Sequence, residues 1–455
     1  GVELDRKTMR PIGGKVALIN GDPWSRGYER FGEDHCENPR TEAEIDRLFD
    51  AFLKECERNG SMPPKENYAM IRATFAGMPY IEGAWMTKHN GRYYLQYACP
   101  GAEINVYADG VYVSDYPLGP FIPAENNPYS YHPDGFMPGA GHGSTLQDRE
   151  GAFWHTATMR ISMNHIFERR VGIWPAGFDP EGNLFCNQRY GDWPMDVEKI
   201  RKNPWADPEW MLLSYGKAVT VSSCDPSHPA ENAVDENCQT WWRAADAQPG
   251  QGLTVDLGKP MKIHAAQVNF ADDPDANISS PAKLVTGPDM PRYIDLTEHH
   301  TRWLLEASAD GENWSVLADK RQAETDLSHD LAIVESGVTA RFIRLTIEEV
   351  PYHVPPCISG LRVFGKGNGG KPTAADFTAH RIGDLDFIVS AESEGAQGYN
   401  ILWGNDANHL YHSCLVMGDT LREKRIGALV KGQKYAVRVD AFNENGIAHG
   451  RTCFL

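Results

Sequence analysis

A hairpin signal at residues 81–98 restricts the fold more than any other stretch of this chain. Two runs of strand-like composition flank the pair Asn90-Gly91, which favours the positive φ angles of a tight hairpin turn. Strand-length segments separated by such turns indicate antiparallel all-β structure. Similar turn pairs occur at Asp109-Gly110, Glu150-Gly151 and Glu181-Gly182.

One helix is expected to interrupt the strands of the N-terminal region (residues 1–208). Between residues 41 and 57 the apolar side chains recur at helical spacing, and the acids Glu42 and Glu44 suit the first turn of a helix. We therefore predict a helical insertion there. The strands expected in this region are residues 15–20, 83–88, 93–98, 110–114, 152–159 and 182–187.

Length and charge limit the class of protein. At 455 residues the chain is expected to form about three domains, since a domain averages roughly 150 residues. The formal charge of -18 disfavours nucleic acid and anionic membrane surfaces as partners, and a neutral partner is easier to accommodate. No apolar run reaches the roughly 18 residues of a membrane span. Residues 1–5 do not read as a signal peptide, and the nine cysteines, without a C-x-x-C pair, signal neither a zinc site nor a disulfide framework.

Two further domains are expected after the N-terminal region. A linker at residues 203–210 leads into the middle domain (residues 209–367), and four glycines within residues 365–371 predict a flexible joint before the C-terminal module (residues 368–455). The strands expected in these domains are residues 252–257, 265–270, 303–307, 341–347, 387–391, 398–403 and 435–441.

Several spaced motifs of the N-terminal region resemble the later blades of glycoside hydrolase family 43, the five-bladed β-propeller glycosidases. The resemblance covers about residues 1–205 and implies an incomplete propeller here. It rests on Glu82-Gly83-Ala84-Trp85, Asn90-Gly91-Arg92-Tyr93-Tyr94-Leu95, Tyr107-Ala108-Asp109-Gly110-Val111, Pro117-Leu118-Gly119-Pro120-Phe121 and Gly141-His142-Gly143-Ser144.

This resemblance implies an inverting glycosidase that needs no cofactor for its chemistry. Glu82 matches the family's general acid, for which we expect burial beside Trp85 and neighbouring rings, whereas the base and a second Asp are expected upstream of Gly1, in a separate N-terminal segment that completes the propeller. His142 matches the axial histidine that holds a water or metal ion in many relatives. From residue type alone, a solvated glutamate and a structural histidine remain open.

Candidate sugar contacts are Trp85, Arg160 and Arg189. An aromatic ring offers an apolar face to a sugar, and an arginine can anchor hydroxyl or carboxylate groups. An arginine near a strand end also commonly sits in a structural ion pair, so that alternative stays open for both arginines.

The middle domain resembles the discoidin or coagulation-factor C-type fold, a jelly-roll β-sandwich common as a carbohydrate-binding module. The motifs include Leu213-Ser214-Tyr215-Gly216-Lys217, Thr240-Trp241-Trp242 and Ala340-Arg341-Phe342-Ile343-Arg344-Leu345. Asp235 and Thr240 match a loop that often holds a structural Ca²⁺. Gly360 stands where relatives often carry a glutamate, and residues 272–300 form a long insertion.

The C-terminal module resembles a fibronectin type III domain, an immunoglobulin-like β-sandwich, through Gly398-Tyr399-Asn400-Ile401-Leu402-Trp403 and Val437-Arg438-Val439-Asp440-Ala441. We expect it to act as a spacer. Together the resemblances predict a secreted, cell-surface or periplasmic bacterial glycosidase acting on β-xylosides or α-L-arabinofuranosides of plant polysaccharide. The alternative is a carbohydrate-binding protein without catalysis, because the base is not expected in this chain.

Overall fold

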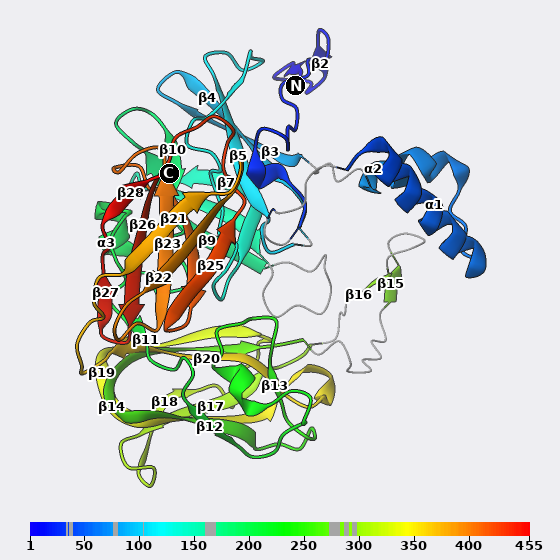
Figure 1. The fold of residues 1–455 in the computed structure, drawn as a ribbon. Coiled ribbons are helices and arrows are strands. Elements are labelled where there is room, and N and C mark those ends of the chain that lie inside the picture. Colours follow the sequence, from blue (N-terminus) through cyan, green and yellow to red (C-terminus); the bar gives the residue numbers. More distant parts are fainter. Residues whose placement is uncertain are drawn as a thin grey trace.

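The computed structural model describes residues 1–32, 35, 40–75, 81–102, 104–159, 170–272, 283–285, 291–293 and 298–455 (Figure 1). Antiparallel strands are its main regular structure, with few helices, so the expected all-β class is confirmed. The five-bladed propeller and the immunoglobulin-like sandwich stay predictions.

The N-terminal region contains two four-stranded antiparallel sheets, each with its strands in chain order. The turn at Asn90-Gly91 has φ angles of 48° and 85°, as the hairpin signal predicted. Asp109-Gly110, in contrast, is not a turn, because both residues lie inside a buried strand. The first sheet comprises β3 (Glu82–His89), β4 (Arg92–Cys99), β5 (Ala108–Ser114) and β6 (Ile122–Pro123), and the second comprises β7 (Gly139–Gln147), β8 (Phe153–Met159), β9 (Arg170–Phe178) and β10 (Leu184–Cys186).

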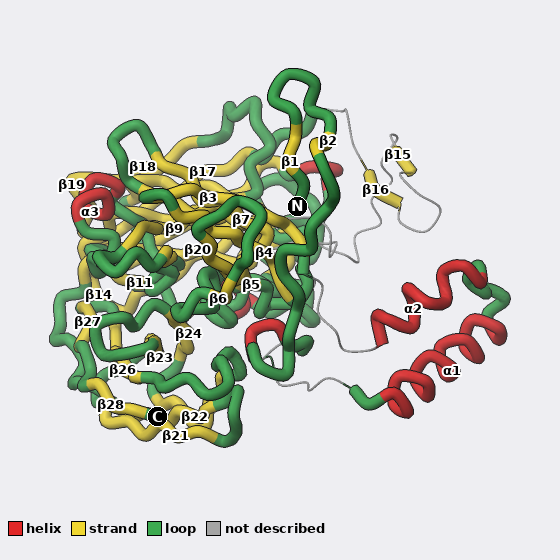
Figure 2. Tube along the Cα trace, turned by 90° about the horizontal axis from the view of Figure 1, so that it is seen from above, coloured by secondary structure: helices red, strands yellow, loops and turns green. Residues whose placement is uncertain are grey.

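The predicted helical insertion is confirmed as α1 (Glu42–Arg58), which begins at a capping box between Thr41 and Glu44. Its apolar face packs on α2 (Tyr68–Phe75), a helix that the sequence did not predict, with Phe49 and Tyr68 ring centroids 5.5 Å apart. Figures 1 and 2 show this helix pair standing away from the sheets. None of the described helices is long and apolar enough to span a membrane.

Residues 15–20, where a strand was expected, have no strand structure. They follow the short pair β1 (Glu3–Leu4) and β2 (Pro11–Ile12). The remaining α-helix described in this region, α3 (Val197–Lys202), is capped by Asp196, whose carboxylate accepts the backbone N–H groups of Glu198 and Lys199.

The middle domain is one curled eight-stranded sheet around a core that includes Trp242 and Trp303. The segments 252–257 and 265–270 belong to a single strand of 20 residues, whose register shifts after Asp256 and bends it around the core. The strands are β11 (Met211–Leu212), β12 (Ala218–Val221), β13 (Trp242–Arg243), β14 (Gln251–Phe270), β17 (Arg302–Ser308), β18 (Trp314–Asp319), β19 (His329–Glu349) and β20 (Cys357–Lys366), and a separate pair is formed by β15 (Lys283–Val285) and β16 (Pro291–Tyr293).

Two sheets face each other in the C-terminal module and share a core with Phe387 and Trp403. One sheet is β21 (Asp376–Arg381), β22 (Phe387–Glu392) and β25 (Thr420–Ile426), and the other is β23 (Gly398–Gly404), β24 (His412–Met417), β26 (Ala436–Asn443), β27 (Gly446–Ala448) and β28 (Thr452–Phe454).

The C-terminal module is docked on the N-terminal region, which contradicts the expected spacer role (Figure 1). Tyr28 and Tyr97 of the N-terminal region belong to the same buried cluster as Trp403. Arg30 pairs with Asp386 at 2.7 Å, with side chains only 1% and 10% exposed.

The predicted flexible joint at residues 365–371 is held by hydrogen bonds to residues 444 and 445 of the C-terminal module. The backbone N–H of Gly369 donates to the Asn445 side chain (2.7 Å), and that of Gly367 to the carbonyl of Glu444 (2.9 Å). The glycines therefore allow a close approach of two backbones instead of free movement.

Candidate active site

Glu82 and His142, which lie 60 residues apart in the sequence, meet where the two N-terminal sheets adjoin. The Glu82 carboxylate oxygen Oε1 is 3.7 Å from His142 Nδ1 and accepts the hydroxyl of Tyr107 at 3.2 Å. The side chains of Glu82 and His142 are 47% and 46% exposed. The site therefore combines an accessible carboxyl group, a phenol and an imidazole.

Gly83 makes this approach of the two sheets possible. Its φ is +62°, and a Cβ atom there would lie 2.8 Å from the His142 ring. Any larger residue would push the imidazole away from Glu82 and would strain the backbone.

Asp109 holds His142 from behind. Its buried carboxylate accepts the backbone N–H groups of His142 (2.9 Å) and Gly143 (3.0 Å), and its Oδ2 lies 3.2 Å from His155 Nε2. These bonds support the left-handed backbone of His142, which has φ 56°. Sequence reasoning missed Asp109, Tyr107 and His155. The strand expected at residues 110–114 begins two residues earlier, at Ala108, and so includes Asp109.

Trp85 does not close over the catalytic candidate as expected. Its indole remains 40% exposed, and the indole N–H donates to the backbone carbonyl of Thr145 (3.1 Å) on β7. With the Glu82 side chain about half exposed, the expected burial of that carboxyl group among aromatic rings is wrong.

The two arginine candidates lie elsewhere. Arg160 is outside the described residues. Arg189 is mostly buried, donates to the carbonyl of Trp205 (2.5 Å) and pairs with Asp207 (3.2 Å). It lines a cavity of about 380 Å³ whose lining includes neither Glu82 nor His142.

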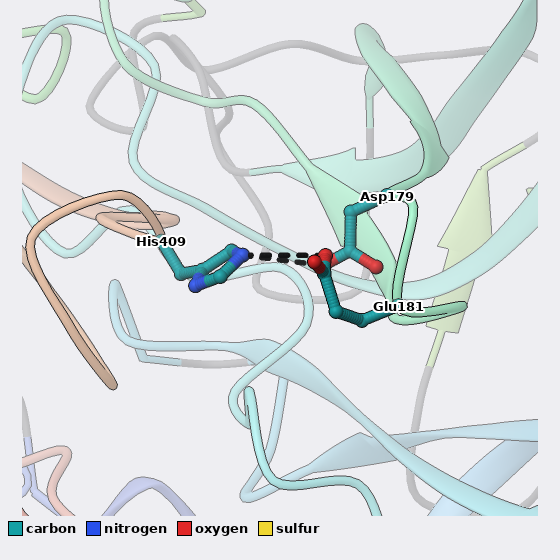
Figure 3. A group of neighbouring side chains, drawn as sticks. All are labelled: Asp179, Glu181 and His409. Carbon is teal, nitrogen blue, oxygen red and sulfur yellow. Dashed lines mark ion pairs between the residues drawn. The ribbon is translucent and has the colours of Figure 1, made fainter.

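One group of potential metal ligands occurs within the described residues, and it does not include His142. Asp179 and Glu181 of the N-terminal region face His409 of the C-terminal module (Figure 3). Asp179 also accepts the Tyr411 hydroxyl (3.0 Å), and His409 bonds to Asp406 (2.7 Å). These contacts describe an ion-pair network between two domains.

The predicted calcium residues lie side by side. Thr240 donates its hydroxyl to Asp235 Oδ2 (2.6 Å), and the backbone N–H of Asn237 donates to Oδ1 (2.9 Å). Burial raises the pKa of Asp235, so a nearby cation would stabilise its charged form. The hard oxygen atoms of this loop fit Ca²⁺. The neighbouring Glu236 is already paired with Arg362 at 2.9 Å.

Comparisons with known proteins support two parts of this interpretation. Residues 53–184 match the model of glycosyl hydrolases family 43. Glu82 and His142 both lie within this match. The model of the F5/8 type C domain matches residues 218–298, which include Asp235 and Thr240.

No curated protein matches the chain. Among solved structures, a glycoside hydrolase is 19% identical over 63% of this chain and 60% of its own, with a TM-score of 0.35. An endo-1,4-beta-xylanase from Bacteroides thetaiotaomicron is 28% identical over 24% of this chain and 38% of its own, with a TM-score of 0.22. Chitosan-binding module 2 of a Paenibacillus chitosanase/glucanase is 20% identical over 34% of this chain and 99% of its own, with a TM-score of 0.26. The chain thus spans less than two thirds of the first of these structures.

Proposed function

We propose that this protein is a glycoside hydrolase in which Glu82 is the general acid. The observation that carries the proposal is the accessible Glu82 carboxyl group, held by Tyr107 beside His142, within the residues that match glycosyl hydrolases family 43. Glycoside hydrolysis requires a carboxylic acid that protonates the leaving oxygen.

The contacts of Glu82 assign its two oxygen atoms different tasks. Oε1 accepts the Tyr107 hydroxyl and faces His142, which leaves Oε2 to carry the proton to the glycosidic oxygen. Inversion also requires a second carboxylate, about 6.5–9.5 Å away, that activates water. Asp109 is unsuitable as this base because its carboxylate is buried and bound by two backbone N–H groups. We propose that a separate N-terminal segment completes the propeller and supplies the base.

The proposed substrates are β-xylosides and α-L-arabinofuranosides of plant polysaccharide, which are neutral and compatible with a chain of charge -18. The middle domain would bind carbohydrate and keep the site near the polymer, outside the cell. Asp235 and Thr240 would hold a structural Ca²⁺ in that domain.

The direct test is hydrolysis of aryl β-xylosides and α-L-arabinofuranosides by the protein supplied with the proposed N-terminal segment. The Glu82→Gln variant and the control Glu150→Gln, which changes an exposed turn residue, are assayed with the same segment. We expect Glu82→Gln to lower the rate by about 10²–10⁴-fold on substrates with poor leaving groups. Undiminished hydrolysis by this variant would refute the role of Glu82.

A carbohydrate-binding protein without catalysis is the second candidate. It is favoured because Asp109, the other carboxylate in the contacts described around His142, is held by two backbone N–H groups and is unsuitable as the base that activates water. This candidate predicts polysaccharide binding without release of reducing sugar. Product release by the unmodified protein that is lost in Glu82→Gln excludes it.

A further inference from the structure

The cavity of about 380 Å³ lies between the N-terminal region and the middle domain, apart from the Glu82 site. Its volume is within the range of about 300–1,000 Å³ typical of small-molecule sites. One wall comes from the segment around Arg189 and α3, and the other comes from β19. Both domains are therefore required to form it.

The cavity contains an apolar platform. Leu331 and Ile333, two residues apart on one face of β19, are 41% and 55% exposed and offer adjoining apolar surface. Trp210 lines the same cavity, and its indole is braced by His264 in a parallel stack with centroids 5.0 Å apart. A rigid indole and two aliphatic side chains suit the C–H face of a sugar ring.

The charged groups of the lining disfavour an anionic ligand. Arg189 pairs with Asp207 (3.2 Å), and Lys199 pairs with Glu209. Each lining cation thus already has a carboxylate partner, so an anionic ligand would have to break an ion pair. The carboxylate oxygen atoms of Asp207 and Glu209 can still accept hydrogen bonds from the hydroxyl groups of a sugar.

We propose that this cavity is a second carbohydrate site, which binds one or two units of a neutral oligosaccharide by stacking on Trp210 and by contact with Ile333. The site is formed by the docking of two domains and is distinct from the proposed catalytic site. A polymer held there would contact the N-terminal region and the middle domain at the same time.

The test is isothermal titration calorimetry with neutral xylo- and arabino-oligosaccharides on the full chain carrying Glu82→Gln, which slows the proposed turnover. We expect saturable binding that weakens at least tenfold in Trp210→Ala and Ile333→Asp. Trp210→Phe should retain most of the affinity because it keeps an aromatic face. The matched control Val316→Asp places the same charge at an exposed apolar position of β18, outside the cavity, and should bind as before.

Equal affinity in Trp210→Ala, Ile333→Asp and Val316→Asp would overturn the proposal, as would the absence of binding. Binding only of glucosamine oligomers or of glucuronate-bearing oligosaccharides would overturn the neutral class. Loss of the proposed catalysis does not bear on this outcome, since Glu82 is outside the lining and hydrolysis is measured separately. A crystal soaked with the bound sugar should place it between Trp210 and Ile333.

Discussion

Substituting Arg30 by methionine should weaken the docking of the C-terminal module on the N-terminal region. Methionine keeps an apolar stem but removes the guanidinium that pairs with Asp386 at 2.7 Å and donates to the carbonyl of Gly427 at 2.9 Å. Breaking a buried ion pair costs about 3–5 kcal/mol because the remaining charge stays buried. Arg425 also lies 3.2 Å from Asp386 and remains after the substitution. We therefore expect a loss near the lower end, about 3 kcal/mol.

The assay is urea unfolding followed by tryptophan fluorescence, because Trp403 is fully buried in the core shared by the two domains. Limited proteolysis should then cut the C-terminal module of Arg30→Met first. The matched control is Arg58→Met on α1, which removes an exposed pair with Glu55 and should cost under about 1 kcal/mol. If Arg30→Met is no less stable than Arg58→Met, the docked arrangement is refuted.

Three further predictions address other contacts. Hydrogen bonds to Asp207 and Asp440 raise the pKa of His449 to about 9, above an unfolded value of about 6.5, so the stability that His449 contributes is complete below pH 6.5 and is lost as the pH rises through 9. The melting temperatures of wild type and His449→Gln should therefore differ most near pH 6 and converge above pH 9. A difference that stays constant with pH would contradict this. Gly83→Ala should lower activity at least tenfold through the clash with His142. Gly91→Ala, at a glycine that also has a positive φ but has open space around it, should cost only about 1–2 kcal/mol of stability and keep activity. Equal activities of the two variants would argue against the clash. Millimolar calcium should raise the melting temperature of wild type but not that of Asp235→Asn, and an equal shift in both would place the ion elsewhere.

Local signals in the sequence predicted local structure well. The pair Asn90-Gly91 supplies the positive φ angles of the hairpin between β3 and β4. Thr41 and Glu44 supply the cap of α1. Each of these features depends on residues only a few positions apart, so one stretch of sequence contains all the information it needs.

Features that depend on distant residues were missed. Asp109 looks like half of a turn pair in the sequence, but the neighbouring strands β4 and β7 enclose it and aim its carboxylate at the backbone of His142. The residues next to Arg30 in the sequence do not indicate its partner, and only the fold brings it to Asp386. Family resemblance suggested separate roles for Glu82 and His142, whereas their approach to 3.7 Å and the exposure of Glu82 depend on three-dimensional packing.

The leaving-group dependence of hydrolysis tests the central claim, that Glu82 donates the proton. The measurement is kcat/KM for a series of aryl glycosides of increasing leaving-group pKa, for wild type and Glu82→Gln, each supplied with the proposed N-terminal segment. A general acid assists poor leaving groups most, so we predict that the variant loses about 10²–10⁴-fold on phenols of high pKa and little on dinitrophenol. An equal loss on every member of the series would contradict the assignment of Glu82 as the acid.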